Sequence, residues 1–266
     1  PHVFSEEFPK DMNKKVIFTS IVGNYDSLLQ PKVIDNSFDY ICFSDNIKEN
    51  SIGVWRIKTI DYDESNNLRR SRYVKLLPHK VLQDYDVSVW IDANIQITGY
   101  EFYEWISKAI EDGVLIAQVP HLLSDCIYKE IRKAFYGGKV PANEAKRQYK
   151  HLRLMGFPEN MGLFENNIIF RWHNDPQVVS ISEDWWKEYN TYSERDQFSL
   201  MYIYWKHNFK AAYLLGPEHN SRNVPYLKYI LHPQIVEKLQ KVSNENKMKR
   251  AIRAMYKKTF IWFFLR

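Results

Sequence analysis

The sequence predicts an α/β fold in which a mostly parallel sheet is flanked by helices. Short apolar segments bounded by polar turns recur between residues 16 and 215, and their β-branched and aromatic residues are typical of buried strands. Segments with apolar residues every three or four positions lie between them and are typical of amphipathic helices. Strands that alternate with helices in this way form a mostly parallel sheet.

The elements follow one another without a long interruption. Strands are expected at 16–22, 39–43, 87–91, 114–119, 163–171 and 211–215. Helices are expected at 67–82, 101–111, 124–136, 143–155, 176–189 and 195–206. Pro78 interrupts the first helix because proline has no N–H to donate. No internal repeat or low-complexity linker divides the chain, so we expect one domain over residues 1–236 and a C-terminal extension over 237–266.

The composition excludes several classes of protein. A chain of 266 residues with 45% hydrophobic residues can bury a large core, and 26% charged residues with 15% aromatics argue against disorder. Cys42 and Cys126 have no pairing pattern, so they predict neither a disulfide scaffold nor a zinc site and favour a cytoplasmic location. We expect no membrane-spanning helix and no secretory signal.

The positive charge is concentrated at the C-terminus. Residues 237–266 contain nine Lys or Arg and two Glu, whereas the first 236 residues contain 28 basic and 30 acidic residues. A net-negative body argues against nucleic-acid binding. The extension predicts a basic amphipathic helix, which would make a peripheral contact with anionic lipid at the inner face of a membrane. A helix packed on its own domain, or on another domain of a longer polypeptide, is the alternative.

Asp92 and Asn94 are candidate oxygen ligands at the end of the strand 87–91. Ligands of open α/β sheets collect outside the carboxyl ends of strands, and such oxygens suit a divalent cation that holds a diphosphate. We expect His219, in the polar segment after the last strand, as the third metal ligand in preference to His121. The alternative is a strand-ending turn that Asp92 and Asn94 cap.

Arg72 and Lys75 are candidate phosphate-binding residues on the preceding helix. They are three positions apart and therefore project from one helical face. Arginine binds phosphate oxygens through two hydrogen bonds, which suits a diphosphate. A solvated helix face is the alternative. The functional interpretation requires that Asp92 and these two cations face a common cleft.

Other polar residues follow or interrupt the predicted strands. Asp45 follows the second strand, where it would contact a nucleobase or ribose or simply cap a turn. The first strand ends near Thr19 and Tyr25, and the Tyr25 ring could stack on a base. Asn166 and Asn167 lie against a buried strand, and amide groups satisfy sugar hydroxyls in both donor and acceptor directions.

Asp196 and Gln197 open the predicted helix 195–206. An acidic residue at that position is commonly a helix cap. Because the following face of the helix is apolar and would hold it rigidly, Asp196 could instead present its carboxylate to a reacting hydroxyl.

The order of these features resembles nucleotide-sugar glycosyltransferases of the GT-A type. Several phrases resemble more closely a bacterial glycosyltransferase-like family formerly called DUF616, and family-8 galactosyltransferases more distantly. The phrases are Ser71-Arg72-Tyr73-Val74-Lys75-Leu76-Leu77-Pro78-His79, Trp90-Ile91-Asp92-Ala93-Asn94-Ile95, Asp125-Cys126-Ile127-Tyr128-Lys129-Glu130 and Arg195-Asp196-Gln197. The resemblance spans residues 15–219.

The resemblance implies a GT-A-like fold and a role for each candidate residue. Asp92 and Asn94 match the family's Asp-X-Asp motif for manganese or magnesium, although Asn94 replaces its second acid. The other implied roles are donor-phosphate contact for Arg72 and Lys75, nucleotide contact for Asp45, the sugar pocket for Asn166 and Asn167, and the neighbourhood of the anomeric carbon for Asp196 and Gln197.

The implied function is hexosyltransferase-like transfer of a sugar from a nucleotide-diphosphate donor, with UDP favoured. The acceptor would be a glycan or a lipid-linked glycan in bacterial surface polysaccharide synthesis. A non-catalytic module that binds nucleotides or carbohydrates is the alternative, because Asn94 removes one negative charge from the motif.

Overall fold

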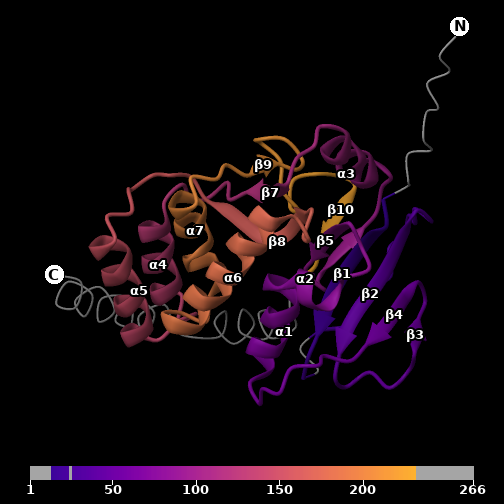
Figure 1. Ribbon diagram of the computed structural model, residues 1–266, viewed down its shortest axis with the longest axis horizontal. Helices are drawn as coiled ribbons and strands as arrows, with labels where there is room; N and C mark the ends of the chain where they lie inside the picture. The colour runs from indigo at the N-terminus through magenta and orange to yellow at the C-terminus, as the bar shows by residue number, and fades with distance from the viewer. Residues whose placement is uncertain (1–12, 24–25, 232–266) are drawn as a thin grey trace, which may run out of the picture.

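The central feature of the computed structural model, which describes residues 13–23 and 26–231, is an eight-stranded sheet (Figure 1). Its strands are, in spatial order, β3 (Ser51–Ile52), β4 (Trp55–Lys58), β2 (Phe38–Ser44), β1 (Lys15–Ile21), β5 (Val87–Ile91), β8 (Phe164–Arg171), β7 (Ile116–Pro120) and β9 (Ala212–Tyr213). Neighbouring strands pair in parallel from β4 to β5 and again between β7 and β9. β3 and β8 run in the opposite direction. The predicted mostly parallel α/β sheet is therefore confirmed.

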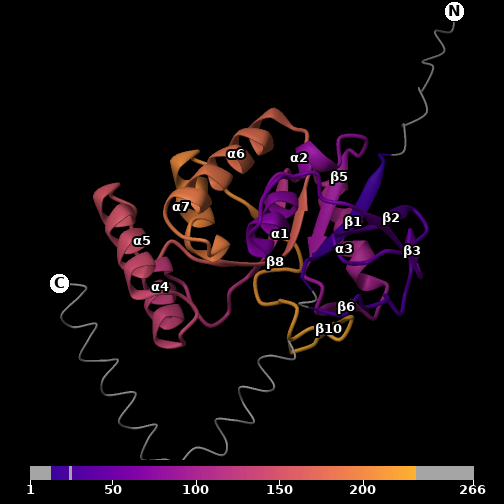
Figure 2. The same cartoon turned by 90° about the horizontal axis from the view of Figure 1, so that it is seen from below.

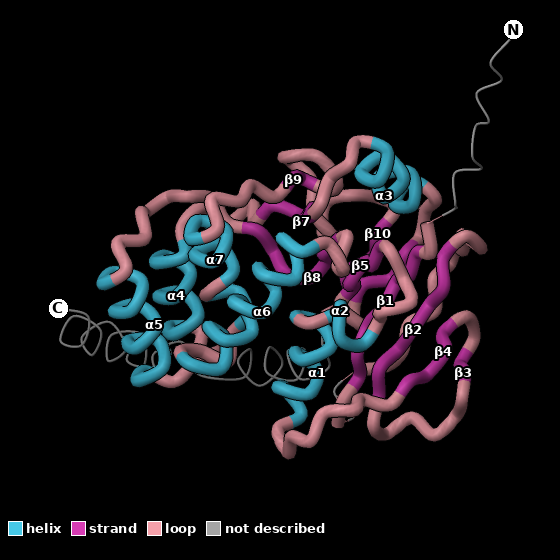
Figure 3. Tube along the Cα trace, in the orientation of Figure 1, coloured by secondary structure: helices cyan, strands magenta, loops and turns pink. Residues whose placement is uncertain are grey.

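Helices cover both faces of the sheet (Figures 2 and 3). Side chains of α1 (Asn67–Leu76), α4 (Ile127–Tyr136), α5 (Ala142–Leu154), α6 (Pro176–Thr191) and α7 (Leu200–Lys206) join one hydrophobic core. Side chains of α3 (Glu101–Glu111) join the core on the other face. Successive residues of β1 divide between these two cores, because strand side chains alternate between the faces of a sheet.

A second, smaller sheet follows the end of β5. β6 (Ile95–Ile97) pairs antiparallel with β10 (Leu227–Tyr229), so the segment after the last helix returns beside the segment that contains Asp92 and Asn94. Residues 94 and 230 therefore lie close together, although they are far apart in the sequence.

The structure also corrects several predicted elements. The predicted helix 195–206 is divided at Ser199 into a 3-10 turn, η1 (Asp196–Phe198), and α7. The interruption predicted at Pro78 within the helix 67–82 is confirmed, because α1 ends at Leu76 and Pro78 begins a separate short helix, α2 (Pro78–Val81). At this first helical position the N–H that proline lacks would have no partner within the helix. The strand predicted at 211–215 contains only β9. The short strands β3, β4, β6 and β10 were not predicted, because segments of two to four residues have no clear periodicity.

Other predictions concern the thiols and membrane spans. Cys42 and Cys126 are both buried free thiols. Within the described residues, no helix combines the length and apolarity needed to cross a membrane. The predicted extension at 237–266 lies outside the described residues.

A buried acid–histidine contact joins α5 to α6. His151 Nε2 lies 2.8 Å from Glu188 Oε1, and the His151 ring stacks on Tyr192 with ring centroids 3.6 Å apart. Burial raises the pKa of Glu188 to about 7 and lowers the pKa of His151. A neutral Glu188 is therefore favoured in the folded chain at mildly acidic pH.

We expect Glu188 to make stability depend on pH. Because its folded pKa is raised from 4.5 to about 7, its stabilising contribution is complete below pH 4.5 and is lost as the pH rises through 7. Replacing Glu188 by Gln should remove that loss, so the stability of the variant relative to the parent should rise by about 3 kcal/mol from pH 4.5 to above pH 7. Urea unfolding of both proteins across the range measures the difference. A difference that does not change with pH would contradict the assignment.

Candidate active site

The side chain of Lys75 is the centre of a buried charge cluster at the end of α1. Its ammonium Nζ lies 2.7 Å from Asp196 Oδ2 and 3.5 Å from Asp92 Oδ1, and only 2% of the side chain is exposed. The ammonium also lies 5.2 Å from the centroid of the Trp90 ring. A buried ammonium is costly without such partners. The predicted alternative of a solvated helix face is therefore wrong for Lys75.

The local structure of α1 explains where Lys75 points. The Asn66 side chain caps the helix by accepting hydrogen bonds from the backbone N–H groups of Leu68 and Arg69. At the other end, the buried Arg171 guanidinium donates a 2.6 Å hydrogen bond to the Lys75 carbonyl. Both ends of α1 are thus held, and its last turn lies against the sheet.

Asp196 is held as a carboxylate by two cations. Its Oδ2 lies 3.3 Å from Arg72 Nε in addition to its contact with Lys75. Burial alone would raise the pKa of Asp196, but the positive charges of Lys75 and Arg72 hold it well below its usual range. The Asp196 side chain faces these cations and does not cap η1, whose N-cap is Arg195. A carboxylate in this state is a poor proton acceptor.

Asp92 lies where the sequence predicted, directly after β5. Trp90 Nε1 donates a 2.7 Å hydrogen bond to Asp92 Oδ1, and the Asp92 backbone N–H donates to the Asn167 carbonyl at 2.9 Å. One third of the Asp92 side chain remains exposed. The structure thus brings Asp92 and Lys75 together at one edge of the sheet.

The other two predicted metal ligands are placed differently. Asn94 is buried, and its Nδ2 donates a 2.8 Å hydrogen bond to the Ile230 carbonyl. The Asn94 Oδ1 atom is buried without a hydrogen-bond partner. His219 is exposed, and its Nδ1 lies 3.0 Å from the Leu215 carbonyl, which leaves Nε2 on the opposite side of the ring.

The donor atoms are of the type that manganese or magnesium accepts. They are a carboxylate on Asp92, an unpartnered amide oxygen on Asn94 and an imidazole nitrogen on His219. Only one of them carries a formal negative charge. Among the residues that the structure describes, no group of three or more His, Cys, Asp or Glu side chains is arranged to hold a metal. The Lys75 ammonium already supplies positive charge beside Asp92.

A break in the pairing of β7 with β8 places two amides beside this cluster. Gln118 pairs with Ile169, but the next residue of β7, Val119, pairs with Glu165, so Asn166 and Asn167 lie in the irregular part of β8. Such irregularities commonly redirect side chains next to functional sites. Both asparagines are buried.

Each of the two amides is only partly satisfied. Gln118 Nε2 donates to Asn166 Oδ1 at 3.0 Å, and Asn167 Nδ2 donates to Ser221 Oγ at 2.9 Å. Asn166 Nδ2 and Asn167 Oδ1 have no hydrogen-bond partner. A free donor and a free acceptor therefore remain at adjacent positions, which is the pattern that a hydroxyl-bearing ligand satisfies.

The sequence did not identify the residues that support these amides. Glu165 forms an ion pair with Arg222 and accepts a 2.8 Å hydrogen bond from Asn167. Asn220 Nδ2 donates to the other oxygen of Glu165 at 3.4 Å. The unusual run of three polar residues at 165–167 in an apolar strand was a visible signal, but their partners beyond residue 219 were not.

The remaining candidate residues make contacts outside the Lys75 cluster or lie in the core. Arg70 Nη1 donates a 2.6 Å hydrogen bond to Asp45 Oδ2, and the Gly23 N–H donates to Asp45 Oδ1 at 3.4 Å. Thr19 is buried within β1, and its hydroxyl has no hydrogen-bond partner. Gln197 Nε2 donates to the Phe164 carbonyl. Tyr25 lies outside the described residues.

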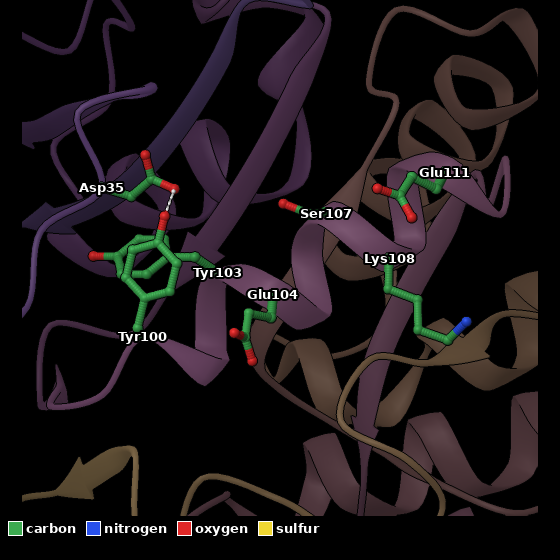
Figure 4. Close-up of a pocket in the computed structure, with 7 residues that line it drawn as sticks. All are labelled: Asp35, Tyr100, Tyr103, Glu104, Ser107, Lys108 and Glu111. Carbon is green, nitrogen blue, oxygen red and sulfur yellow. Dashed lines mark hydrogen bonds between the residues drawn. The ribbon is translucent and has the colours of Figure 1, made fainter.

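A pocket on another part of the surface contains none of the candidate residues. It has a volume of about 330 Å³ and is lined by Asp35, Tyr100, Tyr103, Glu104, Ser107, Lys108 and Glu111 (Figure 4). Five of these residues belong to α3, and Tyr100 donates a 3.2 Å hydrogen bond to Asp35 across one end. Because α3 covers the opposite face of the sheet from α1, this pocket is separate from the charge cluster.

Comparisons with known proteins give one sequence match and several structural likenesses. The family model described as "TOD1/MUCI70, glycosyltransferase-like domain" matches residues 5–220. No curated protein matches the sequence.

The solved structures resemble this chain only loosely. The apo structure of the bifunctional glycosyltransferase WbbM is 12% identical with a TM-score of 0.43, and the match covers 76% of this chain and 39% of that one. The galactosyltransferase LgtC, in complex with donor and acceptor sugar analogues, is 11% identical with a TM-score of 0.44 and coverage of 82% and 87%. Core-mannan synthase A from Aspergillus fumigatus, in its Mn/GDP form, is 10% identical with a TM-score of 0.46 and coverage of 84% and 80%.

We expect replacement of Asp196 by Asn to destabilise the fold strongly. The change removes the closest partner of a buried ammonium, which should cost about 3 kcal/mol of unfolding free energy. Asp112→Asn is a matched control, because its 3.0 Å pair with Lys108 is exposed on both sides and should contribute less than about 1 kcal/mol. Urea unfolding measures both variants. Equal losses in the two would show that Lys75 does not depend on Asp196.

Proposed function

Because this chain belongs to the TOD1/MUCI70 glycosyltransferase-like domain family, we propose that it transfers a sugar from a nucleotide-diphosphate donor to a glycan or lipid-linked acceptor. The observation that carries the proposal is the contact of buried Lys75 with Asp92 at the carboxyl edge of the sheet. Open α/β sheets bind their ligands at this edge. A nucleotide diphosphate is the part of such a donor that matches a cationic cluster.

Lys75 and Arg72 would stabilise the leaving group. As the bond from the sugar to the diphosphate breaks, negative charge grows on the departing phosphate oxygens. Cations already fixed in place lower the barrier because they do not have to reorganise during the reaction. Asp196 would act as a positioning residue, since it holds both cations and is itself held as a carboxylate.

The nucleotide and the metal would bind on either side of this cluster. Asp45, at the end of β2, would contact the nucleoside, and we favour UDP as the nucleotide. Manganese or magnesium would be held by Asp92, Asn94 and His219. When bound, such a cation supplies further positive charge to the diphosphate.

The sugar would be recognised by the irregular part of β8. The unpartnered Asn166 Nδ2 and Asn167 Oδ1 offer a donor and an acceptor to sugar hydroxyls. Glu165, paired with Arg222, holds Asn167 in place. Gln197 would lie beside the anomeric carbon.

The biological setting is also part of the proposal. We place the reaction in bacterial surface polysaccharide synthesis, in the cytoplasm or at the inner face of the membrane. The basic character of residues 237–266 supports a peripheral membrane contact.

We expect one class of nucleoside diphosphate to raise the melting temperature of the protein. Testing UDP, GDP and CDP in turn, with and without manganese, identifies the nucleotide. Hydrolysis of the corresponding nucleotide sugar then separates an enzyme from a non-catalytic binding module, which would bind without turnover. If none of the three nucleotides stabilised the protein, the proposal would fail.

Replacing Lys75 by Met or Arg72 by Gln should weaken binding of that nucleotide. A hydrogen bond to a charged group contributes about 1.5–3 kcal/mol, so the dissociation constant should rise roughly 10- to 100-fold. Calorimetric titration measures the change. Lys80→Gln is the control, because Lys80 lies on α2 and pairs with Glu183 at 2.7 Å. A similar loss in the control would mean that the effect is non-specific.

Asp92→Ala should abolish any gain in nucleotide affinity that manganese produces. His219→Ala and Asn94→Ala should reduce the gain if they are ligands as well. Titrating nucleotide at fixed manganese concentrations measures the coupling. A manganese effect that survives Asp92→Ala would place the cation elsewhere.

A further inference from the structure

An apolar surface lies at the end of the α4–α5 pair, next to the candidate active site. Of the twelve large hydrophobic side chains exposed in the described part of the chain, six lie between residues 122 and 161. Five of them occur at one end of the pair, and we call these five the apolar tip: Leu122, Leu123, Leu154, Met155 and Met161. Leu123 and Leu154 are each 82% exposed. Monomeric proteins rarely gather apolar side chains in this way without a partner.

Contacts between the helix ends show that the apolar tip is one surface. Tyr128, at the start of α4, donates a 2.6 Å hydrogen bond to the Phe157 carbonyl just beyond α5. Arg153, near the end of α5, lies 4.2 Å from the centroid of the Tyr128 ring. The N-terminus of α4 and the C-terminus of α5 therefore lie side by side, as both ribbon views show for the two helices (Figures 1 and 2).

The loops of the apolar tip are joined to the edge of the sheet that carries the site. The His121 N–H donates to the Leu163 carbonyl at 2.8 Å, and the Gly162 N–H donates to the Asp125 carbonyl at 3.0 Å. His121 directly follows β7, and Leu163 directly precedes β8. Gln197, next to Asp196, contacts the first residue of β8. The apolar tip is thus joined through these loops to the start of β8, the strand that carries Asn166 and Asn167.

Exposed basic residues surround the apolar tip. They are Lys129, Arg132, Lys133, Lys150 and Arg153. Two exposed acids, Asp125 and Glu159, pair with Lys129 and Arg153. The positive charges of Arg132, Lys133 and Lys150 therefore exceed the negative charge of the exposed acids nearby. We call the five basic residues the basic rim.

This charge is unusual for the body of the protein. Residues 121–161 contain eight basic and four acidic residues, whereas the rest of the first 236 residues contain 20 basic and 26 acidic ones. A segment as basic as residues 237–266 is a poor occupant of a basic surface, because like charges repel. The charge points to an anionic partner.

We propose that the apolar tip and basic rim dock on an anionic lipid bilayer. Exposed leucine and methionine side chains insert below the headgroups, while lysine and arginine remain at the level of the anionic headgroups. Docking brings the edge that carries the site to the membrane surface, where a lipid-linked acceptor is presented. This last point, unlike the docking itself, rests on the proposed function.

Vesicle binding by the full chain tests the docking. The protein should sediment with phosphatidylcholine vesicles that contain phosphatidylglycerol, and much less with phosphatidylcholine alone. Leu123→Ser with Leu154→Ser should lower the partition coefficient about tenfold or more, because two exposed leucines no longer enter the lipid. The matched control, Leu68→Ser with Tyr100→Ser, changes two exposed side chains outside the apolar tip and should bind like the parent.

A second pair of variants tests the charge. Arg132→Gln with Lys133→Gln should weaken binding to the anionic vesicles about tenfold or more, since each basic residue near such a surface contributes about a factor of five. Lys187→Gln with Lys210→Gln is the control, because both residues are exposed on other elements. Melting temperatures of all variants establish that they are folded.

Several outcomes would overturn the docking proposal. One is unchanged vesicle binding by both the leucine variant of the apolar tip and the Arg132–Lys133 variant of the basic rim, which would assign membrane contact to residues 237–266 or to another surface. Another is a tip variant that loses self-association instead of lipid binding, which would make the occupant a second copy of this chain. Nucleotide binding by the same variants should be unchanged, so failure of docking and failure of the proposed transfer activity are measured separately.

Discussion

The buried ammonium of Lys75 constrains the arrangement of the whole site. An ammonium that is almost completely enclosed must have carboxylates within a few ångströms, and Asp196 and Asp92 supply them at 2.7 and 3.5 Å. These partners come from η1 and from the end of β5. Lys75 itself comes from α1, so one charged group fixes the relative positions of three elements that are distant in the sequence. The cationic groups are therefore in place before any ligand binds.

The polar groups around this cluster differ in how many of their hydrogen-bonding atoms have partners. Arg171 holds the last turn of α1 and Trp90 holds the carboxylate of Asp92, each through one hydrogen bond, although Arg171 Nε and Nη1 have no partner. Asn166 and Asn167, next to them, retain unpartnered atoms. A site that binds a charged, hydroxylated ligand needs both kinds of group, because rigid charges position the ligand and free hydrogen-bonding groups distinguish it. The geometry thus agrees with the family to which the chain belongs.

Much of the fold followed from periodicity, whereas the partners within the site did not. The long strands β1, β2 and β8 and the amphipathic helices were predicted because each carries a clear apolar pattern. The sequence also placed Asp92 at a strand end and Lys75 on the preceding helix. It could not show that Asp196 is clamped by both cations, because that contact joins residues more than 100 positions apart. Nor could it show that Asn94 is bonded to Ile230, since this depends on the short strands β6 and β10.

The proposed function depends on Lys75 and Arg72, held by Asp196, forming a preorganised diphosphate site. A crystal structure of the protein with the nucleoside diphosphate that stabilises it most is the most direct test. We expect phosphate oxygens within hydrogen-bonding distance of Arg72 and Lys75, with Asp196 still in contact with both cations. A diphosphate bound away from these residues, with the Lys75–Asp196 pair undisturbed and inaccessible, would contradict it.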